Sequence, residues 1–142
     1  MTWHAVAICF ALLGATATAD AQQPAPTSTS AGVFTEEQAK KGGVAYNANC
    51  AACHGSELLS TDREVSNLTG NTFQRWIGKT VADLFEVTRD TMPPKDERSL
   101  DNQIYLDIVA YILRFNKIPA GSEELKPEVQ RLRQITIAKP PG

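Results

Sequence analysis

The chain has 142 residues, of which 42% are hydrophobic and 21% are charged. This length suits one domain with its own core and is too short for two comfortable ones. The formal net charge is only −2 at pH 7, which argues against a broad basic surface for nucleic acid or anionic membranes.

Residues 1–21 have the pattern of a secretory signal peptide. An uncharged apolar run over residues 4–15 precedes the small-x-small sequence Ala19-Asp20-Ala21. The run is shorter than the roughly 20 apolar residues that a membrane span needs. No Lys or Arg precedes it, so an uncleaved anchor is the alternative. We expect cleavage, export to the periplasm and no stable membrane span.

The segment that follows leads into the first helix. Residues 22–33 are rich in Pro, Ser, Thr and Ala, which predicts a flexible linker. The sequence from Thr35 to Gln38 then has the spacing of a capping box, and it predicts a helix over about residues 35–47. Ala39, Gly42 and Tyr46 share one stripe of that helix.

Three more helices are predicted after a loop over residues 55–71. A short one covers residues 71–78, and the next runs from Thr80 to about Asp90 with Leu84, Phe85 and Val87 inward. The last begins at Asp101 or Asn102 and has the strongest apolar periodicity of the chain. No pattern predicts a strand, so the predicted fold class is all-α. Residues 118–142 form an extension that packs on the domain or trails from it.

Once the signal peptide is removed, few residues remain that can hold a metal or cofactor. They are Cys50, Cys53, His54 and Met92. The first three lie in the sequence Cys-Ala-Ala-Cys-His, which four chemistries can use. A disulfide would close only a tiny loop, and a redox dithiol of the thioredoxin type expects a βαβ context. Structural zinc needs four ligands, so a carboxylate would have to join these three.

The fourth chemistry is covalent attachment of haem, for which Cys-x-x-Cys-His is the signature. On a turn after a helix, the Cys50 and Cys53 thiols can reach the two vinyl groups along one porphyrin edge. His54 is then directed at the iron. Covalent attachment suits an exported protein, because haem lost outside the cytoplasm is not easily recaptured. This is the interpretation that we favour.

The chain here resembles the class I (monohaem) cytochrome c family over roughly residues 34–117, in its small bacterial periplasmic form. Gly42 and Tyr46 stand eight and four residues before Cys50, where that family has a glycine and an aromatic residue in its first helix. Residues 108–112 match the aliphatic-x-x-aromatic pattern of its last helix. The resemblance implies several short helices around one haem c, with the first and last helices crossing and with Tyr111 or its neighbour packed on Gly42.

The second axial ligand of the iron decides between two kinds of haem protein. Met92 is the only methionine after the signal peptide, and Thr91-Met92-Pro93-Pro94 looks like the Met-Pro ligand loop of the family. A methionine that only fills a core gap is the alternative. An open coordination site, with Arg89 facing the iron, would instead indicate a gas binder or peroxidase.

The resemblance also suggests the walls of the haem pocket. Trp76 resembles the family tryptophan that binds a haem propionate. Leu68, Phe73, Leu84 and Phe85 are expected to line the ring. Many family members have a proline shortly before the leucine that corresponds to Leu68, and its carbonyl orients the haem histidine; here Ser66 or Asn67 takes that place.

The expected function is single-electron transfer through His/Met-ligated haem, with no catalytic residues. A periplasmic dehydrogenase is the expected donor, and an oxidase or another cytochrome is the expected acceptor. The chain could also be the cytochrome subunit of a larger quinoprotein or molybdenum dehydrogenase. The sequence identifies none of these partners.

Overall fold

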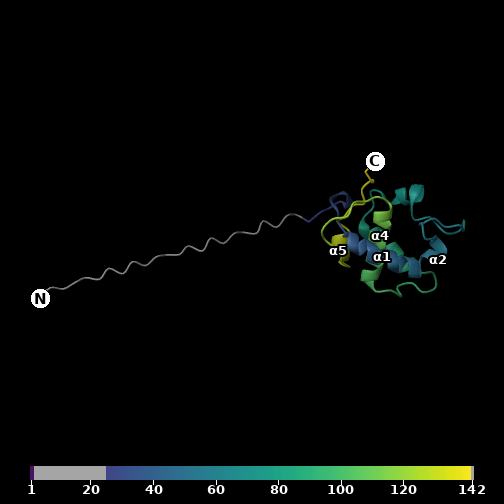
Figure 1. The fold of residues 1–142 in the computed structure, drawn as a ribbon, viewed down its shortest axis with the longest axis horizontal. Coiled ribbons are helices and arrows are strands. Elements are labelled where there is room, and N and C mark those ends of the chain that lie inside the picture. Colours follow the sequence, from purple (N-terminus) through teal and green to yellow (C-terminus); the bar gives the residue numbers. More distant parts are fainter. Residues whose placement is uncertain (2–24, 142) are drawn as a thin grey trace.

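The computed structural model describes Met1 and residues 25–141 (Figure 1). The elements in this part of the chain are the 3-10 helices η1 (Thr29–Ala31) and η2 (Gly70–Trp76) and the α-helices α1 (Glu36–Asn49), α2 (Ala51–His54), α3 (Val81–Thr91), α4 (Asn102–Phe115) and α5 (Val129–Leu132). Residues 25–141 contain two isolated β-bridges and no strand, so the all-α prediction is confirmed. The expected signal peptide lies outside the described residues, apart from Met1. Among the described helices, none has the length and apolarity that a bilayer crossing requires.

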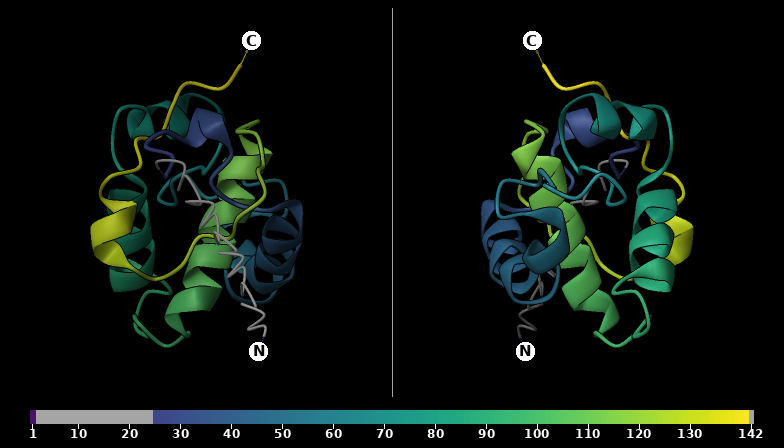
Figure 2. Two further views of the ribbon diagram at one scale, coloured as in Figure 1. Left: turned by 90° about the vertical axis from the view of Figure 1, so that its left-hand side faces the viewer. Right: turned by 90° about the vertical axis from the view of Figure 1, so that its right-hand side faces the viewer.

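The centre of the fold is the crossing of α1 and α4, which both views of Figure 2 show. The two backbones touch at Gly42, where a Cβ would lie 1.7 Å from the Asp107 carbonyl oxygen. The ring of Tyr111, expected near Gly42, faces Gly43 instead. A Cβ on Gly43 would lie 3.2 Å from Tyr111 Cδ2. Tyr111 also packs on Tyr46, with ring centroids 5.2 Å apart. The glycine pair thus sets the distance between the two longest helices.

The start of α1 is tied to the C-terminal part of the chain through Gln38. Thr35 caps the helix, since its Oγ1 accepts from the Gln38 amide at 3.0 Å. The Gln38 side chain does not complete the expected capping box. It is fully buried, donates to Leu125 O (2.9 Å) and Asp107 Oδ1 (3.0 Å), and accepts from Leu125 N (2.8 Å). These bonds satisfy a buried amide that would otherwise be costly.

Residues 120–141, here called the C-terminal strap, pack on the domain. The strap contains α5, which lies against α3 (Figure 2). Ile137 N donates to Lys79 O at 2.8 Å, and Ile137 O accepts from Gly78 N at 2.9 Å. Four of its apolar side chains are buried: Leu125, Leu132, Ile135 and Ile137. The strap therefore holds the segment that leads into α3.

The N-terminal residues 25–33 lie along the opposite edge of the strap. Thr29 N donates to Thr136 O at 3.0 Å, and Thr136 N donates to Thr27 O at 2.9 Å. Thr29 is fully buried, and its Oγ1 accepts from Ala138 N at 2.9 Å. Of the flexible linker expected over residues 22–33, the described residues 25–33 are thus bonded to the strap. Composition does not reveal a partner for the backbone more than 100 positions away.

The helix α3 begins with a complete capping box. Thr80 Oγ1 accepts from Asp83 N at 3.1 Å, and Asp83 Oδ2 accepts from Thr80 N at 2.8 Å. The hydrogen bond from the Thr80 backbone, and then that from its side chain, lower the pKa of the Asp83 carboxyl. The helix runs to Thr91, so its C-terminal end places Met92 just beyond the last turn.

The close approach of the helices at Gly42 gives a first prediction. Gly42→Ala should destabilise the domain by about 1–3 kcal/mol or more, because its Cβ would meet the backbone of α4, which cannot yield locally. Gly43→Ala is the control, since its Cβ meets only the Tyr111 side chain and alanine favours a helix. Urea unfolding measures both; equal losses would contradict the proposed backbone contact.

The strap gives a second prediction. Ile137→Ala should lower the free energy of unfolding by about 2–5 kcal/mol, because Ile137 is fully buried. Thr136→Ala keeps the backbone bonds, and its exposed side chain should matter little. Thermal or denaturant unfolding compares the two variants. An Ile137→Ala protein as stable as the wild type would show that the strap is not part of the core.

Candidate functional site

One cavity of about 400 Å³ brings together the four residues that the sequence singles out. Cys50, Cys53, His54 and Met92 all line it, although Met92 lies 38 positions after His54. The cavity is bounded by α1, α2, η2, α3 and α4 and by the loop that follows His54. Most of its exposed wall is apolar.

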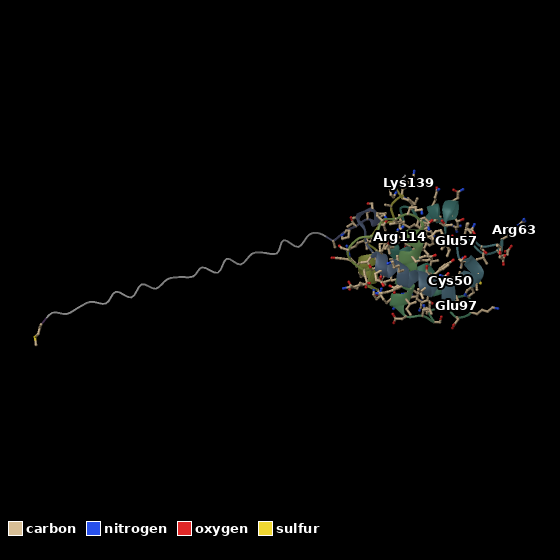
Figure 3. The ribbon with its side chains drawn as sticks, in the orientation of Figure 1. Cys50, Glu57, Arg63, Glu97, Arg114 and Lys139 are labelled. Atoms are coloured by element: carbon tan, nitrogen blue, oxygen red, sulfur yellow. The ribbon has the colours of Figure 1, made fainter. Side chains whose placement is uncertain are left out.

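The first wall is the turn between α1 and α2. Cys50, labelled in Figure 3, is the residue between the two helices. Its amide donates to Tyr46 O at 2.8 Å. The Tyr46 hydroxyl donates to Gly55 O at 2.7 Å, which holds the far end of the turn. Tyr46 is fully buried, and its burial raises the pKa of its hydroxyl, so this group stays a donor. The Cys-Ala-Ala-Cys-His segment is thus fixed at both ends.

Both cysteines are free thiols. Cys50 is half-buried and Cys53 is exposed, so the two sulfur atoms lie at the wall and at the rim of the cavity. Burial, followed by the nearby Cys53, raises the pKa of the Cys50 thiol to about 11. The structure therefore gives no support to the disulfide alternative. In residues 25–141, no three His, Cys, Asp or Glu side chains gather as a metal site would require.

His54 is held by the loop that follows it. Its Nδ1 lies 2.9 Å from Ser66 O, and since a carbonyl can only accept, Nδ1 carries the proton. The lone pair of Nε2 is then free to bind a metal. The sequence left Ser66 and Asn67 as candidates for this carbonyl, and the structure selects Ser66. The Asn67 side chain instead accepts from Ser60 N at 2.8 Å, which shapes the same loop.

The opposite wall is formed by α3 and Met92. The helix lines the cavity with residues at positions i, i+3, i+4 and i+7, which are Leu84, Val87, Thr88 and Thr91. Phe85, which the sequence placed in the haem pocket, is not among the lining residues. Phe85 follows Leu84 in the helix and is buried in the core. The Arg89 guanidinium carbon lies over its ring, 4.9 Å from the ring centroid. Val87 was expected to be inward, yet it borders the cavity and is 46% exposed.

The remaining predicted pocket residues do line the cavity. Leu68, Phe73 and Trp76 form part of its wall, with Phe73 buried and the other two half-buried. Arg75 adds a cation at the wall, and its Nε donates to Thr72 O at 3.0 Å. Sequence reasoning placed Ile108 and Ile112 in the last helix without assigning them to the pocket. The two residues are four positions apart on the apolar stripe of that helix, and this spacing could have indicated that both face the same site.

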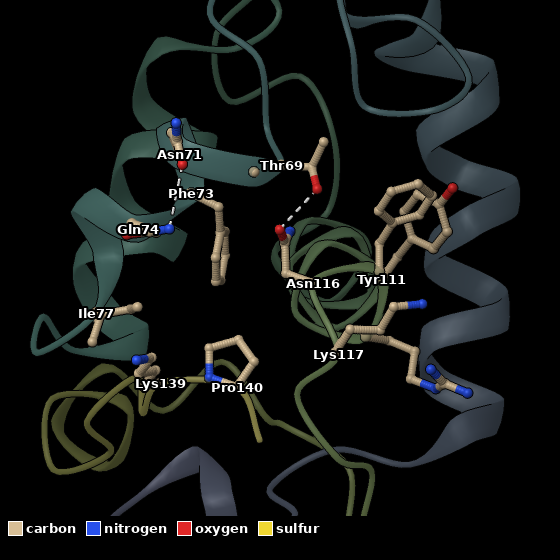
Figure 4. A pocket seen from close by; sticks show the side chains of 13 residues that line it. Thr69, Asn71, Phe73, Gln74, Ile77, Tyr111, Asn116, Lys117, Lys139 and Pro140 are labelled. Atoms are coloured by element: carbon tan, nitrogen blue, oxygen red, sulfur yellow. Dashed lines mark hydrogen bonds between the residues drawn. The ribbon is translucent and has the colours of Figure 1, made fainter. Parts of the chain in front are cut away.

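A second cavity, of about 640 Å³, lies between η2, the end of α4 and the strap (Figure 4). It is lined by Phe73, Tyr111 and Asn116 among others, and Asn116 Oδ1 accepts from the Thr69 hydroxyl at 3.0 Å. None of its lining residues is Cys, His or Met. Phe73 lines both cavities and lies between them. Of the two cavities, only the first is lined by Cys, His and Met side chains, so it is the candidate haem site.

Arg89 is the residue on which an open coordination site would depend. Its Nε and Nη2 donate to both carboxylate oxygens of Asp90, at 2.6 and 3.0 Å. It is not among the residues that line the cavity. The structure therefore brings together Cys50, Cys53, His54 and Met92 at one cavity. It leaves Arg89, the polar distal residue of the open-site alternative, outside that cavity.

Comparison with known proteins agrees with this geometry. The model of the family described as "Cytochrome C oxidase, cbb3-type, subunit III" matches residues 37–112, which is more than half of the chain. The chain therefore belongs to this family. It is a haem electron-transfer protein with a cytochrome c fold, as the resemblance to class I cytochromes c implied.

A solved structure supports the same fold. The structure of the sulfane dehydrogenase SoxCD from Paracoccus pantotrophus matches with a TM-score of 0.50 and 18% sequence identity. The match covers 75% of this chain and 60% of that chain, which is less than two thirds of its length. At this identity the likeness shows the fold alone. No curated protein sequence matches the chain.

Proposed function

We propose that this protein is a periplasmic carrier of single electrons that holds one covalently bound haem c. The observation that carries the proposal is the cavity in which Cys50, Cys53, His54 and Met92 meet. Haem, when bound, supplies the one-electron couple of its iron. The residues of the chain attach it, orient it and exclude water.

The two thiols are suited to attachment at one edge of the cavity. Cys50 and Cys53 would hold the haem through two thioether bonds, each thiol supplying its sulfur to one vinyl carbon and its hydrogen to the neighbouring carbon. No oxidant is needed and no atom is lost. The exposed position of Cys53 leaves this edge open at the surface, where a redox partner could approach.

His54 and Met92 would hold the haem iron from two walls of the cavity. The Ser66 carbonyl keeps the His54 proton on Nδ1, which leaves Nε2 for the iron. Met92 offers a thioether sulfur from the other wall, and such a ligand favours the reduced iron. With both axial positions filled by the protein, the charge of the iron can change without ligand exchange. This favours rapid electron transfer over gas binding or peroxidase chemistry.

The partners follow from this role. We expect a dehydrogenase as the donor and an oxidase or another cytochrome as the acceptor, joined by transient contacts of less than about 1,200 Å². The shared fold with a structure of a sulfane dehydrogenase is consistent with a second possibility, that the chain is the electron-transfer subunit of such an enzyme. Export through the signal peptide expected at residues 1–21 would place the protein in the periplasm.

Covalent attachment is tested by replacing the two cysteines. In the wild-type protein, haem should remain with the chain after denaturation and acid extraction with organic solvent. In the Cys50→Ser/Cys53→Ser variant it should be lost, because serine hydroxyls do not form the thioether bonds. Haem staining of a denaturing gel measures the difference. Extraction of haem from the wild-type protein would contradict the proposal.

The role of Met92 is tested by Met92→Leu, which keeps the volume of the side chain and removes its sulfur. The reduction potential should fall by more than about 59 mV, the shift for a tenfold change in a one-electron equilibrium. Val87→Ala, which alters the same cavity wall without touching a donor atom, is the control and should change the potential much less. An unchanged potential in Met92→Leu would mean that the second ligand is not Met92.

A further inference from the structure

Met92 is connected to α4 by one partly buried side-chain hydrogen bond. The Tyr105 hydroxyl donates to the Met92 carbonyl oxygen at 2.9 Å. Tyr105 lies in the first turn of α4 and is only 1% exposed, while Met92 is the extended residue that ends α3. The bond therefore joins the candidate ligand to the helix that crosses α1.

The sequence around Met92 leaves few other ways to fix its backbone. Pro93 and Pro94 have no amide hydrogens, so beyond the Met92 amide the backbone of this segment can form hydrogen bonds only through its carbonyl groups. The last carbonyls of a helix also lack partners within the helix. Pro93 O accepts from Asp96 N at 3.0 Å, a local turn, whereas Met92 O is bound by Tyr105 from another helix.

A second contact holds the outer side of the same loop. Asp90 accepts from Arg89 and, at 3.0 Å, from Arg98 Nε, and Arg98 N donates to Arg89 O at 3.1 Å. The Arg98 side chain is 67% exposed, so water and salt weaken its ion pair. The Tyr105 bond is partly buried and its donor side chain is only 1% exposed, so we expect it to contribute more to the position of Met92.

We propose that Tyr105 is a positioning residue that keeps Met92 at the haem iron through the Met92 carbonyl. The proposal rests on the proposed function, in which Met92 is an axial ligand. Without the hydroxyl, the segment from Met92 to Pro94 loses its only described side-chain hydrogen bond to another helix. The sulfur then leaves the iron more often, and a competing ligand binds more readily.

The chain offers a matched control on the other side of the cavity. The Tyr46 hydroxyl donates to Gly55 O at 2.7 Å, and Tyr46 is as deeply buried as Tyr105. Tyr46→Phe and Tyr105→Phe each remove one buried hydroxyl-to-carbonyl bond and keep the ring. They should therefore cost similar stability. Only the second acts on the Met92 side.

The experiment is an imidazole titration of the oxidised, haem-loaded protein, followed by its absorption spectrum. Imidazole must displace Met92, so its apparent dissociation constant includes the free energy of releasing that ligand. Tyr105→Phe should lower this constant about two- to tenfold, the change expected for the loss of one hydrogen bond. Tyr46→Phe loosens the turn that carries His54 and leaves the Met92 segment intact, so it should lower the constant much less than Tyr105→Phe does. Met92→Leu should lower it most.

The outcomes separate the two proposals. If Tyr105→Phe binds imidazole like the wild type while Met92→Leu binds it more tightly, the role of Tyr105 is refuted and the ligand assignment stands. Equal changes in Tyr46→Phe and Tyr105→Phe would also refute it, since they would reflect general stability. If Met92→Leu itself matches the wild type, Met92 is not the ligand and the proposed function fails at that point.

Discussion

The contact between the α1 and α4 backbones at Gly42 is the constraint on which the site depends. It brings Tyr46 of α1 and Ile108 and Ile112 of α4 to one end of the same cavity. A wider crossing would move these walls apart. The width of the cavity beside Cys50, Cys53 and His54 thus depends on a backbone contact made by none of the four candidate haem-binding residues.

The fold and the donor residues were largely accessible from the sequence because they depend on local patterns. Helical spacing predicted α3 and α4, and the Cys-x-x-Cys-His spacing selected the donors. Phe85 was misplaced because it and Leu84 are neighbours on one helix, and apolar character alone does not say which of them faces a cavity. The Ser66 carbonyl was one of two candidates, since the backbone path of a loop is not encoded in side-chain type.

The segments at the two chain ends were the hardest to predict, for a physical reason. Residues 25–33 contain few apolar side chains, and they are joined to the strap by backbone bonds of Thr27 and Thr29 to Thr136 and by the bond from Ala138 N to Thr29 Oγ1. The backbone bonds are available to any sequence, so composition gives no sign of them. Gln38 is a similar case: its side chain was expected to cap its own helix but binds Leu125 in the strap.

The hydrogen bonds between residues 27–29 and 136–138 also affect when the domain can finish folding. Thr29 and Ala138 are 109 positions apart, yet a hydrogen bond joins them, and the strap between Ile135 and Ile137 binds the entrance to α3. Contacts of such long range form late, because a large loop must close first. The segment before α3 therefore gains its final support only after residues 135–137 have been synthesised.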